Sequence, residues 1–530
     1  MMSPRDLDLL NGPSGPTQHG MGRRRFLRIG RDVGLLAAAG VLPAWRHTPR
    51  LRFQESPFSL GVASGDPSPS GAVLWTRLDA SAVAAADATD RELAVRWEVA
   101  ADEGFQRVVR SGQARALPGL GHSVHVEVEG LDPDAWYWYR FDSGGAGSPV
   151  GRVRTAPEQG RAPERLRFAF ASCQHYEQGY FTAFEHMVRE EPDLIVHLGD
   201  YIYETRWGTT VQERLRSDEE PHTLQEYRDR YAMYRSDPNL QRAHAACPWI
   251  VTWDDHEVDN NYADAVPEDD QSLEAFLVRR AAAYQAYYEF MPLRRSALPT
   301  GPNMQLFRRI DFGDLASFHV LDTRQYRSDQ SCGDGRKPMC AETLDPDRTL
   351  LGVEQESWLS GELRASRARW NVLAQQIRVA QAALPGPSGE DEFSMDMWDG
   401  YPAARARLLD ALGECANPVV ITGDIHTHWA ADLKQDFSNP RSASVGVELV
   451  GTSITSGGDG EHVTTPPAAI QANPHVHFFD NERGYVSVTL DRDLCRAEFR
   501  TVPFVTRPGA PLVTRATFVS EAGSRRLERG

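Results

Sequence analysis

The sequence predicts a mixed α/β fold, in which a small all-β module precedes a larger part that alternates apolar strands with helices. Residues 58–156 consist of short runs of alternating apolar and polar residues, separated by Gly, Pro and Asp, as in the antiparallel strands of a sandwich. From about residue 160 onward, short apolar runs end in polar clusters, and helical stretches lie between several of them. That second pattern is typical of an α/β sheet.

Composition and charge are those of a globular protein without a stable nucleic-acid partner. The 530 residues are 41% hydrophobic and 25% charged, which is ordinary for a chain of two or three domains. The formal net charge of −17 argues against a duplex-binding protein, because such a protein needs a basic surface to neutralise phosphates. We expect a monomer.

The first 48 residues are predicted to lie outside the fold. RRRFL at residues 23–27 precedes a mildly apolar run at 33–42, which is too short to span a bilayer. This pattern resembles a twin-arginine export signal, and the alternative is an arbitrary Arg-rich start. We therefore expect a signal peptide at residues 1–48, a mature protein without an integral membrane segment, and a final location in the periplasm, the cell wall or the medium.

Four strands are expected in the all-β module, which we assign to residues 55–156. They are the runs at 73–79, 92–100, 122–131 and 136–144. No catalytic group of side chains accompanies them, so we expect a packing or positioning role for the module. The larger part is assigned to residues 160–505. Residues 506–530 are expected to form a strand or short helix capping the entrance to the site, or a partly disordered tail.

Six apolar runs in the larger part end in polar clusters. They are RLRFAFASC, DLIVHLGDYIYE, WIVTWDDHE, SFHVLDTRQYR, WNVLAQQI and NPVVITGDIHTHW. Helices are expected at residues 180–189, 273–290 and 402–412. Because α/β sheets place active sites at the carboxyl ends of their strands, we expect these clusters to mark the functional site.

The clusters contain side chains of the kinds that bind metal ions. GDYIY at 199–203 offers the carboxylate of Asp200 and the phenol of Tyr203, and TWDDHEVDNNY at 252–262 holds four acids, one His and two Asn. In GDIHTH at 423–428, Asp424, His426 and His428 alternate, so an extended segment would direct all three to one side. Burying such groups without a cation is costly, so the pattern favours a metal site over a solvated acidic loop.

In this combination and order, the motifs resemble the metallophosphoesterase superfamily and, within it, the PhoD-like alkaline phosphatases and phosphodiesterases. The resemblance covers about residues 55–500 and is carried by FSLGVASGDPSPSGAVLWTRL (58–78), FASCQ (170–174), GDYIYE (199–204), WDDHEVDNN (253–261), LDTRQYR (321–327), WDGYPAAR (398–405) and TGDIHTHW (422–429). It implies a four-layer α-β-β-α sandwich, preceded by a small fibronectin- or Ig-like β domain. It also implies an exported, metal-dependent alkaline phosphatase or phosphodiesterase, which hydrolyses organic phosphate esters by attack of a metal-bound hydroxide for phosphate acquisition.

The resemblance further implies most of the metal ligands. Tyr203 would bind a ferric ion as tyrosinate, Cys173 stands where related enzymes carry a first-strand Asp, and Asp200 would bridge two metals. Asp255 stands where the superfamily usually has Asn, and Asp424 stands where it usually has the first His of G-H-x-H.

These departures make the site rich in oxygen, which suits calcium, whereas a thiolate and a phenolate favour a trivalent, redox-capable ion over magnesium. The implied cofactors are Fe³⁺ and one or two Ca²⁺ ions, with Zn²⁺ or Mn²⁺ as alternatives. His426 is a further implied ligand, and either Asn260 or Asn261 could add an oxygen. The simpler alternatives are an inert buried thiol for Cys173 and a packed aromatic ring for Tyr203.

Other residues of these motifs are candidates for catalysis and substrate binding. His256, next to the metal ligand Asp255, would protonate the leaving alkoxide or stabilise the phosphoryl oxygens. Arg324 is expected either to form a structural ion pair or to contact phosphate. Tyr401 and Arg405, in WDGYPAAR, are candidate substrate contacts on a lid or pocket wall.

Some groups retain an alternative outside the site. For His428, a supporting or surface role stays open beside ligation. His175, His197, His244 and His319 are expected to be structural. Cys332 and Cys340 lie in the polar loop SCGDGRKPMC and are predicted to form a local disulfide, as in other exported proteins.

The leading prediction is therefore a hydrolase of small-molecule phosphate esters. One alternative is a phospholipase D-type phosphodiesterase that acts on phospholipid headgroups. A second is a non-catalytic surface binding protein on the same scaffold, against which the intact motifs argue.

Overall fold

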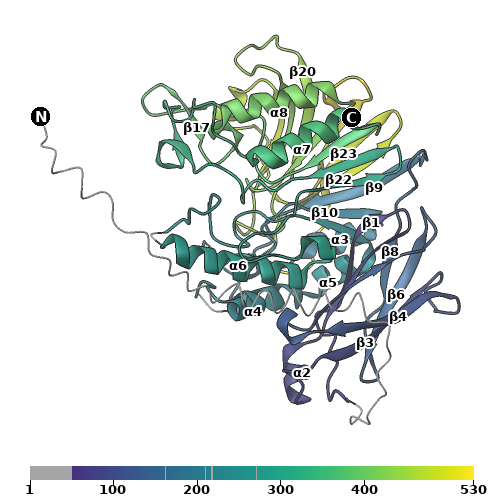
Figure 1. The fold of residues 1–530 in the computed structure, drawn as a ribbon. Coiled ribbons are helices and arrows are strands. Elements are labelled where there is room, and N and C mark those ends of the chain that lie inside the picture. The colour runs from purple at the N-terminus through teal and green to yellow at the C-terminus, as the bar shows by residue number, and fades with distance from the viewer. Residues whose placement is uncertain (1–50, 162, 209, 217–218, 270) are drawn as a thin grey trace, which may run out of the picture. The chain divides into compact units, whose positions relative to one another are not determined.

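The computed structural model describes residues 51–530 except 162, 209, 217, 218 and 270 (Figure 1). The predicted signal peptide at residues 1–48 lies outside the described residues. In the described part of the chain, no helix combines the length and the apolar character needed to cross a membrane.

The fold is mixed α/β, as predicted, and is built around two large sheets. The larger has ten strands, in the order β25 (Glu528–Arg529), β24 (Val513–Glu521), β23 (Leu494–Val502), β22 (Arg483–Asp491), β9 (Arg165–Ala171), β10 (Leu194–His197), β11 (Pro248–Val251), β1 (Val62–Ser68), β2 (Gly71–Arg77) and β5 (Ser123–Val128). The other has seven strands, in the order β12 (Arg308–Phe312), β13 (Ala316–Val320), β15 (Trp370–Ala374), β18 (Pro418–Thr422), β20 (Ser444–Val450), β19 (His428–Lys434) and β21 (Val476–Asp480).

Two smaller sheets complete the described strands. A five-stranded sheet contains β3 (Leu93–Ala100), β4 (Val108–Ala116), β6 (Trp136–Ser143), β7 (Ala146–Gly147) and β8 (Gly151–Arg154). A three-stranded sheet contains β14 (Arg336–Lys337), β16 (Leu384–Pro385) and β17 (Asp391–Ser394).

Side chains on alternate positions of the central strands enter different cores. Val196 of β10 and Val372 of β15 belong to one apolar cluster that joins the two large sheets, whereas Ile195 and Leu373 face separate clusters that contain helices. This period of two explains why these strands are apolar throughout, since both faces are buried.

The helices fall into two groups, each packed against one large sheet. Residues of α3 (Thr182–Arg189), α4 (Leu224–Arg235), α5 (Pro238–Ala246) and α6 (Leu273–Phe290) share a cluster with β10 and β11. Residues of α7 (Gly352–Ala365) and α8 (Pro402–Glu414) share a cluster with β15 and β18. Figure 1 shows α7 and α8 together in the upper part of the view, and α4 and α6 in the lower part. Two short helices, α2 (Ala80–Ala85) and α9 (Ala468–Gln471), lie outside these groups.

The predicted helices are present with small shifts at their ends. The helix expected at residues 273–290 is α6, which has those bounds. The helix expected from residue 180 begins at Thr182 as α3, and the one expected to end at residue 412 continues to Glu414 as α8.

The N-terminal strands are divided between two sheets. β2 and β5 pair with each other, and β1 pairs in parallel with β11, so these three strands extend the ten-stranded sheet. Their apolar side chains form one cluster with those of β3, β6 and β8. Residues 58–156 therefore share a sheet with the part of the chain that follows them.

The end of the chain also belongs to the ten-stranded sheet. Among the alternatives for residues 506–530, the strand is the one observed for residues 513–521, which form β24 and pair with β23. β25 then pairs with β24 at the edge of the sheet.

Candidate metal centre

The parallel strands of the two large sheets end near one another. β9, β10 and β11 are parallel neighbours, as are β13, β15, β18 and β20. Beyond the strand ends, Ser172 forms a parallel bridge with Ser453, and Thr252 Oγ1 donates a 2.9 Å hydrogen bond to Leu321 O. These contacts join the loops of one sheet to those of the other and bring the polar clusters together.

The backbone turns sharply where these strands end. Cys173, Asp200, Asp424 and His426 have φ angles of 59°, 54°, 63° and 55°. A non-glycine residue in this left-handed region costs about 1–3 kcal/mol, and such residues concentrate at functional sites. Gly199 precedes Asp200 with φ of 114°, and a Cβ there would lie 2.5 Å from Asp254 Cβ. Only glycine fits at this position of the GD motif.

This backbone corrects one prediction from the sequence. Residues 424–426 are not extended, so Asp424, His426 and His428 do not alternate along a strand. His428 is the first residue of β19; its ring lies edge-on to Phe499, 5.2 Å between centroids, and Phe499 belongs to the core between the sheets. Its Nδ1 accepts a 3.2 Å hydrogen bond from the backbone N–H of Thr452. His428 is therefore a core residue in this structure.

Three overlapping groups of side chains could hold metal ions. In each group, the potential ligand atoms lie within 4.8 Å of one another. The groups are Cys173, Asp200 and His426; Asp200, Asp255 and His256; and Asp254, Asp255 and Asp424. Because Asp200 belongs to the first two groups and Asp255 to the last two, the groups form one continuous centre.

The first group includes a thiol, a carboxylate and an imidazole, and Tyr203 joins it. The Tyr203 hydroxyl donates a 2.8 Å hydrogen bond to Asp200 Oδ2 and lies 3.1 Å from His426 Nε2. Burial, together with the charge of Asp200, raises the pKa of the Cys173 thiol and of the Tyr203 phenol.

One buried atom of this group has no partner in the described part of the chain. Asp200 is 1% exposed, and its Oδ1 makes no hydrogen bond. Leaving a buried carboxylate oxygen unsatisfied is costly, so it needs a further partner. A cation held by Asp200, Cys173 and Tyr203 would meet that need, and the donor set therefore fits a metal.

The third group offers carboxylate oxygens alone. Asp255 is held in place because its Oδ1 and Oδ2 accept hydrogen bonds from the backbone N–H of His256 and Asn261, at 3.0 and 2.7 Å. Burial raises the pKa of Asp254 to about 6, although Arg324 opposes the shift. Burial and Asp254 likewise raise the pKa of Asp424. Crowded buried carboxylates of this kind are stabilised by a hard cation.

Arg324 lies at the centre of these acids. It is fully buried; its Nε donates to Asp254 Oδ1 at 2.5 Å, and its Nη1 and Nη2 donate to Asp396 at 2.9 and 3.2 Å. Nη2 also lies 3.7 Å from both Asp255 and Asp424. Of the two alternatives for Arg324, the ion pair is the one observed.

His256 stands at the rim of the centre with a carboxylate behind it. Its Nδ1 lies 2.7 Å from Glu204 Oε2, and its ring packs on Tyr203 at 4.2 Å between centroids. Burial opposes protonation, but Glu204, Asp255 and Asp200 together raise the pKa of His256 well above its ordinary value. The imidazole is thus oriented by Glu204 and keeps 15% of its side chain exposed.

The two asparagines are directed to acidic neighbours. Asn260 donates its side-chain N–H to Glu268 at 2.5 Å and its backbone N–H to Glu204 at 3.1 Å. Asn261 donates from Nδ2 to Asp334 Oδ2 at 3.0 Å, and its backbone N–H binds Asp255. Asn261 is therefore hydrogen-bonded to Asp255, a residue of the metal groups. Asn260 is hydrogen-bonded to Glu204, which in turn contacts His256.

Tyr401 and Arg405, the other predicted substrate contacts, are buried, and neither belongs to the three metal groups. Tyr401 is fully buried and donates to Ser328 O at 2.7 Å. Arg405 is 5% exposed and pairs with Asp399. WDGYPAAR leads into α8, and both side chains are bonded to protein groups.

Sequence reasoning missed several residues of the site. Glu204 and Asp254 stand inside the motifs GDYIYE and DDHE, so their position beside the predicted ligands was a usable signal. Asp396 stands two residues before the motif WDGYPAAR, and it is the fold that brings its carboxylate to Arg324.

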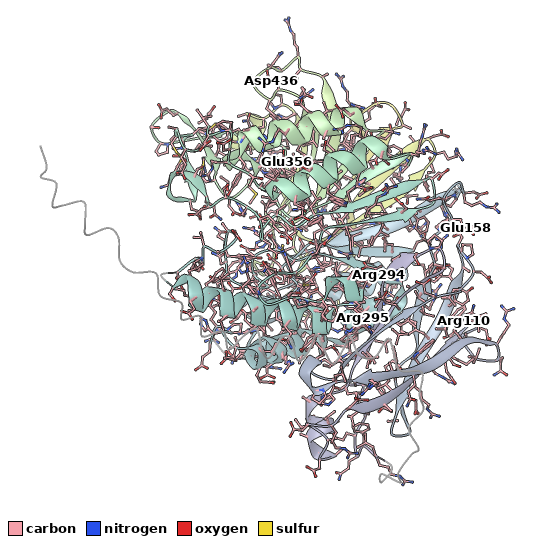
Figure 2. The ribbon with its side chains drawn as sticks, in the orientation of Figure 1. Arg110, Glu158, Arg294, Arg295, Glu356 and Asp436 are labelled. Atoms are coloured by element: carbon pink, nitrogen blue, oxygen red, sulfur yellow. A yellow bond between two sulfur atoms is a disulfide. The ribbon has the colours of Figure 1, made fainter. Side chains whose placement is uncertain are left out.

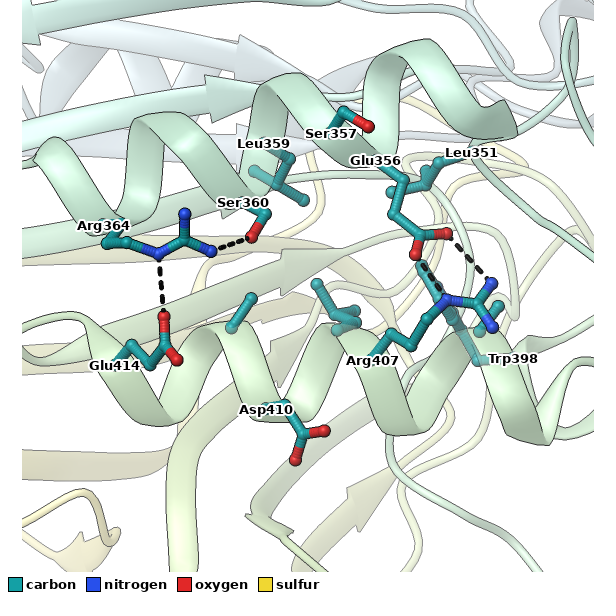
Figure 3. Close-up of a pocket in the computed structure, with 13 residues that line it drawn as sticks. Leu351, Glu356, Ser357, Leu359, Ser360, Arg364, Trp398, Arg407, Asp410 and Glu414 are labelled. Carbon is teal, nitrogen blue, oxygen red and sulfur yellow. Dashed lines mark hydrogen bonds and ion pairs between the residues drawn. The ribbon is translucent and has the colours of Figure 1, made fainter. Parts of the chain in front are cut away.

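The centre differs from the outer surface and from the pocket between α7 and α8. Figure 2 shows charged side chains such as Arg110 and Asp436 at the outside, whereas Asp200 and Asp255 are 1% and 2% exposed. The pocket in Figure 3 has a volume of about 500 Å³, and none of its lining residues belongs to the metal groups. Four of its charged side chains form pairs, Arg407 with Glu356 and Arg364 with Glu414.

The loop between Cys332 and Cys340 contacts the metal centre through Asp334. The two cysteines form a disulfide bond. In the same loop, Asp334 accepts the hydrogen bond from Asn261, so the disulfide closes a loop that contacts the metal groups.

Comparison with known proteins agrees with this geometry. The model of the PhoD-like phosphatase family matches residues 168–499, and the model of the N-terminal domain of PhoD-like phosphatases matches residues 44–157. The chain is 51% identical over 508 residues to alkaline phosphatase D of Bacillus subtilis (strain 168), covering 94% of this chain and 87% of that protein. A solved structure described as the structure of PhoD superposes with a TM-score of 0.86 at 51% identity, covering 90% of this chain and 93% of the other. The chain therefore belongs to the PhoD-like phosphatase family.

Proposed function

We propose that the protein is an exported, metal-dependent phosphatase or phosphodiesterase that releases phosphate from small organic esters for phosphate acquisition. As a member of this family it is a phosphoric ester hydrolase; metal dependence, export and the physiological role are the proposed parts. The observation that carries the metal dependence is the continuous centre, in which three groups of ligand atoms share Asp200 and Asp255.

The two ends of the centre suit different cations. Cys173, Tyr203, His426 and Asp200 combine sulfur, phenol, imidazole and carboxylate, which favours Fe³⁺. Asp254, Asp255 and Asp424 offer oxygen alone, which favours one or two Ca²⁺ ions. Zn²⁺ and Mn²⁺ are the alternatives. When bound, the cations supply a water nucleophile of lowered pKa and neutralise charge on the phosphoryl oxygens.

The chain's own residues then have separate tasks. Asp200 belongs to both the first and the second group and would keep them at a fixed spacing. Arg324 holds Asp254 and Asp396 by direct hydrogen bonds. His256 donates a proton from Nε2 to the leaving oxygen, while Glu204 fixes the ring through Nδ1.

The scaffold is consistent with the expected layers. We interpret α3–α6, the ten-stranded sheet, the seven-stranded sheet and α7–α8 as the four layers of a metallophosphoesterase. The five-stranded sheet, with β1, β2 and β5, would be the preceding β domain.

Hydrolysis assays on the purified, metal-loaded protein test the proposal. We expect release of p-nitrophenol from p-nitrophenyl phosphate or from its bis ester. Asp255→Ala removes the ligand oxygens and should remove most of this activity, whereas Asp436→Ala, at an exposed position, should not. Absence of hydrolysis of both esters after loading with iron and calcium would contradict the proposal. Faster choline release from phosphatidylcholine vesicles than from soluble esters would favour the phospholipase D-type alternative.

A further inference from the structure

Trp207 is an exposed aromatic side chain next to the metal centre. In the described part of the chain, Trp207 is the aromatic residue among the exposed large apolar side chains, at 39% exposure. The others are Val and Leu. A Trp side chain is usually buried or engaged in binding, because its large surface is costly to hydrate.

The indole contacts the rings that surround the centre. It is nearly parallel to His426, with centroids 6.0 Å apart and an interplanar angle of 10°. It also packs on Tyr203, at 6.4 Å and 59°, and meets His175 edge-on at 6.0 Å. The indole therefore packs on two of the proposed metal ligands, Tyr203 and His426.

Two segments hold the backbone of Trp207 in place. Its carbonyl accepts a hydrogen bond from Gln178 Nε2, and Gln178 Oε1 in turn accepts a 2.6 Å bond from the Gly457 N–H. Gly208, which follows, has a left-handed φ of 63°. The indole is thus anchored at the rim while part of its surface stays open to solvent.

The leaving group of an ester is expected on the side of the centre where His256 stands. His256, which we assign as its proton donor, and Trp207 both pack on the ring of Tyr203, at 4.2 and 6.4 Å. We expect an ester whose phosphoryl group is at the metal groups and whose leaving oxygen faces His256 to direct its organic group toward the exposed rim, where the indole is 39% exposed.

We propose that Trp207 is a specificity-determining residue that stacks on the organic group of the substrate. The substrate class is phosphate esters with an aromatic ring within a few atoms of the ester oxygen. This inference rests on the proposed function and refines it. Stacking on an aromatic side chain stabilises a flat ring without requiring hydrogen-bond recognition, so different aromatic esters would be accepted.

The test is the equilibrium binding of three phosphonates, which carry the same anionic head and are not hydrolysed. Benzylphosphonate carries a flat ring, cyclohexylmethylphosphonate a puckered ring of similar size, and methylphosphonate no ring. Their affinities for protein loaded with iron and calcium are measured by calorimetry. The proteins compared are the wild type, Trp207→Ala, Trp207→Phe and, as control, Val353→Ala, at an 82% exposed position of α7.

We expect Trp207→Ala to lower the affinity for benzylphosphonate by about tenfold, in line with measured base–aromatic stacking. The affinity for methylphosphonate should stay within about twofold of the wild-type value. Trp207→Phe should retain most of the affinity for benzylphosphonate, and Val353→Ala should change nothing. Equal weakening of all three ligands in Trp207→Ala would overturn the proposal, because the indole would then only shield the centre. Equal loss for the flat and puckered rings would overturn it too, since the contact would be apolar and unselective.

Failure of the proposed role of Trp207 can be distinguished from failure of the proposed hydrolase function. Binding of phosphonates needs no turnover, so a wild-type protein that hydrolyses no ester can still discriminate benzylphosphonate from methylphosphonate. Conversely, a wild-type protein that hydrolyses esters but binds the two phosphonates equally well would contradict the role of Trp207 alone.

Discussion

Glu204 acts on the centre through His256. It accepts from His256 Nδ1 at 2.7 Å and from the backbone of Asn260 at 3.1 Å, so one carboxylate fixes both the ring and the loop behind it. A carboxylate on one ring nitrogen holds the tautomer and orientation in which the other nitrogen carries the transferred proton.

Glu204→Gln should therefore lower turnover most where protonation of the leaving oxygen matters most. We expect kcat on an alkyl phosphate such as ethyl phosphate to fall by about 10- to 100-fold, and kcat on p-nitrophenyl phosphate, whose leaving group needs little protonation, to fall less. Glu268→Gln, an exposed neighbour, is the matched control. An equal loss on both esters would contradict the role of the Glu204–His256 pair in protonation.

Arg324 makes a different kind of contribution, because it stabilises buried acids in the folded protein. With its side chain removed, Asp254 loses its cationic partner inside the core, and Asp396 keeps only Arg327 and Gln330. Arg324→Leu should lower the free energy of unfolding of the metal-free protein by about 3–5 kcal/mol, as for other broken buried pairs. Arg407→Leu breaks the pair with Glu356, in which Arg407 is 41% exposed, and should cost about 0–1 kcal/mol. Urea unfolding compares the two variants, and similar losses would show that Arg324 does not stabilise the acids.

At the scale of elements, the disulfide closes a loop that supports the centre. Gln330 Nε2 donates to Asn261 O at 2.7 Å, and Asp334 accepts from the Asn261 side chain. Asn261 in turn bonds Asp255. The Cys332–Cys340 bond spans the segment that carries Asp334, so it limits the movement of a direct partner of Asn261.

Replacing both Cys332 and Cys340 by Ser should lower the free energy of unfolding by about 2–3 kcal/mol, the loop-closure effect expected for a short loop. Denaturant unfolding of the double variant and of the oxidised wild type measures the difference. In the presence of a reductant, the two proteins should become equally stable. A wild type that keeps its whole advantage after reduction would exclude the disulfide as the cause.

Strand exits and helices could be predicted to different degrees. α6 was predicted with its observed bounds, and local signals mark both of its ends: the Ser272 side chain caps the first turn by accepting from the Ala275 N–H, and Pro292 follows two residues after the last helical residue. The left-handed backbone at Asp424 and His426 was not predicted, since alternation of polar residues indicates a strand unless the turn is known. Tertiary contacts decide that turn: Arg483 Nη1 and Thr452 Oγ1 both donate to the carbonyl of His426, each at 2.8 Å.

At the scale of the whole molecule, the two ends of the described chain complete the large sheet. β24 places Phe518 and Ala516 in the core between the sheets. Arg515 pairs with Glu482, and Arg525 donates to the carbonyls of Gly413 and Cys415, at 2.9 and 2.8 Å. The last strands are therefore part of the fold.

A chain truncated after residue 505 should fail to fold stably. It would lose β24 and β25 and expose β23, and burial of Phe518 alone contributes about 1.5–3 kcal/mol. Solubility, circular dichroism and thermal unfolding of the truncated protein check this, with a protein lacking residues 1–48 as the control that should remain folded. A soluble, cooperatively folded product ending at residue 505 would contradict this account of the C-terminus.

The residues of the site could be predicted from the sequence more completely than the pairing of the strands. The apolar runs predicted where the polar clusters lie, and the family resemblance implied Cys173, Asp200, Asp255 and His426 as ligands. The fold brings these residues together in overlapping groups, within each of which the ligand atoms lie within 4.8 Å of one another. Sharing of β1, β2 and β5 with the large sheet could not be predicted, since pairing between distant strands such as β1 and β11 leaves no local pattern. Arg324 could be described only as a choice between two roles, because Asp396 is 72 residues away in the chain.

The central claim is that Tyr203 and Cys173, with Asp200, hold a metal ion that the hydrolysis requires. An absorption spectrum with elemental analysis of the purified protein tests it most directly. We predict iron and calcium in the wild type and a broad visible band that disappears in Tyr203→Phe. A colourless, metal-free protein that nevertheless hydrolyses phosphate esters at full rate would contradict the claim.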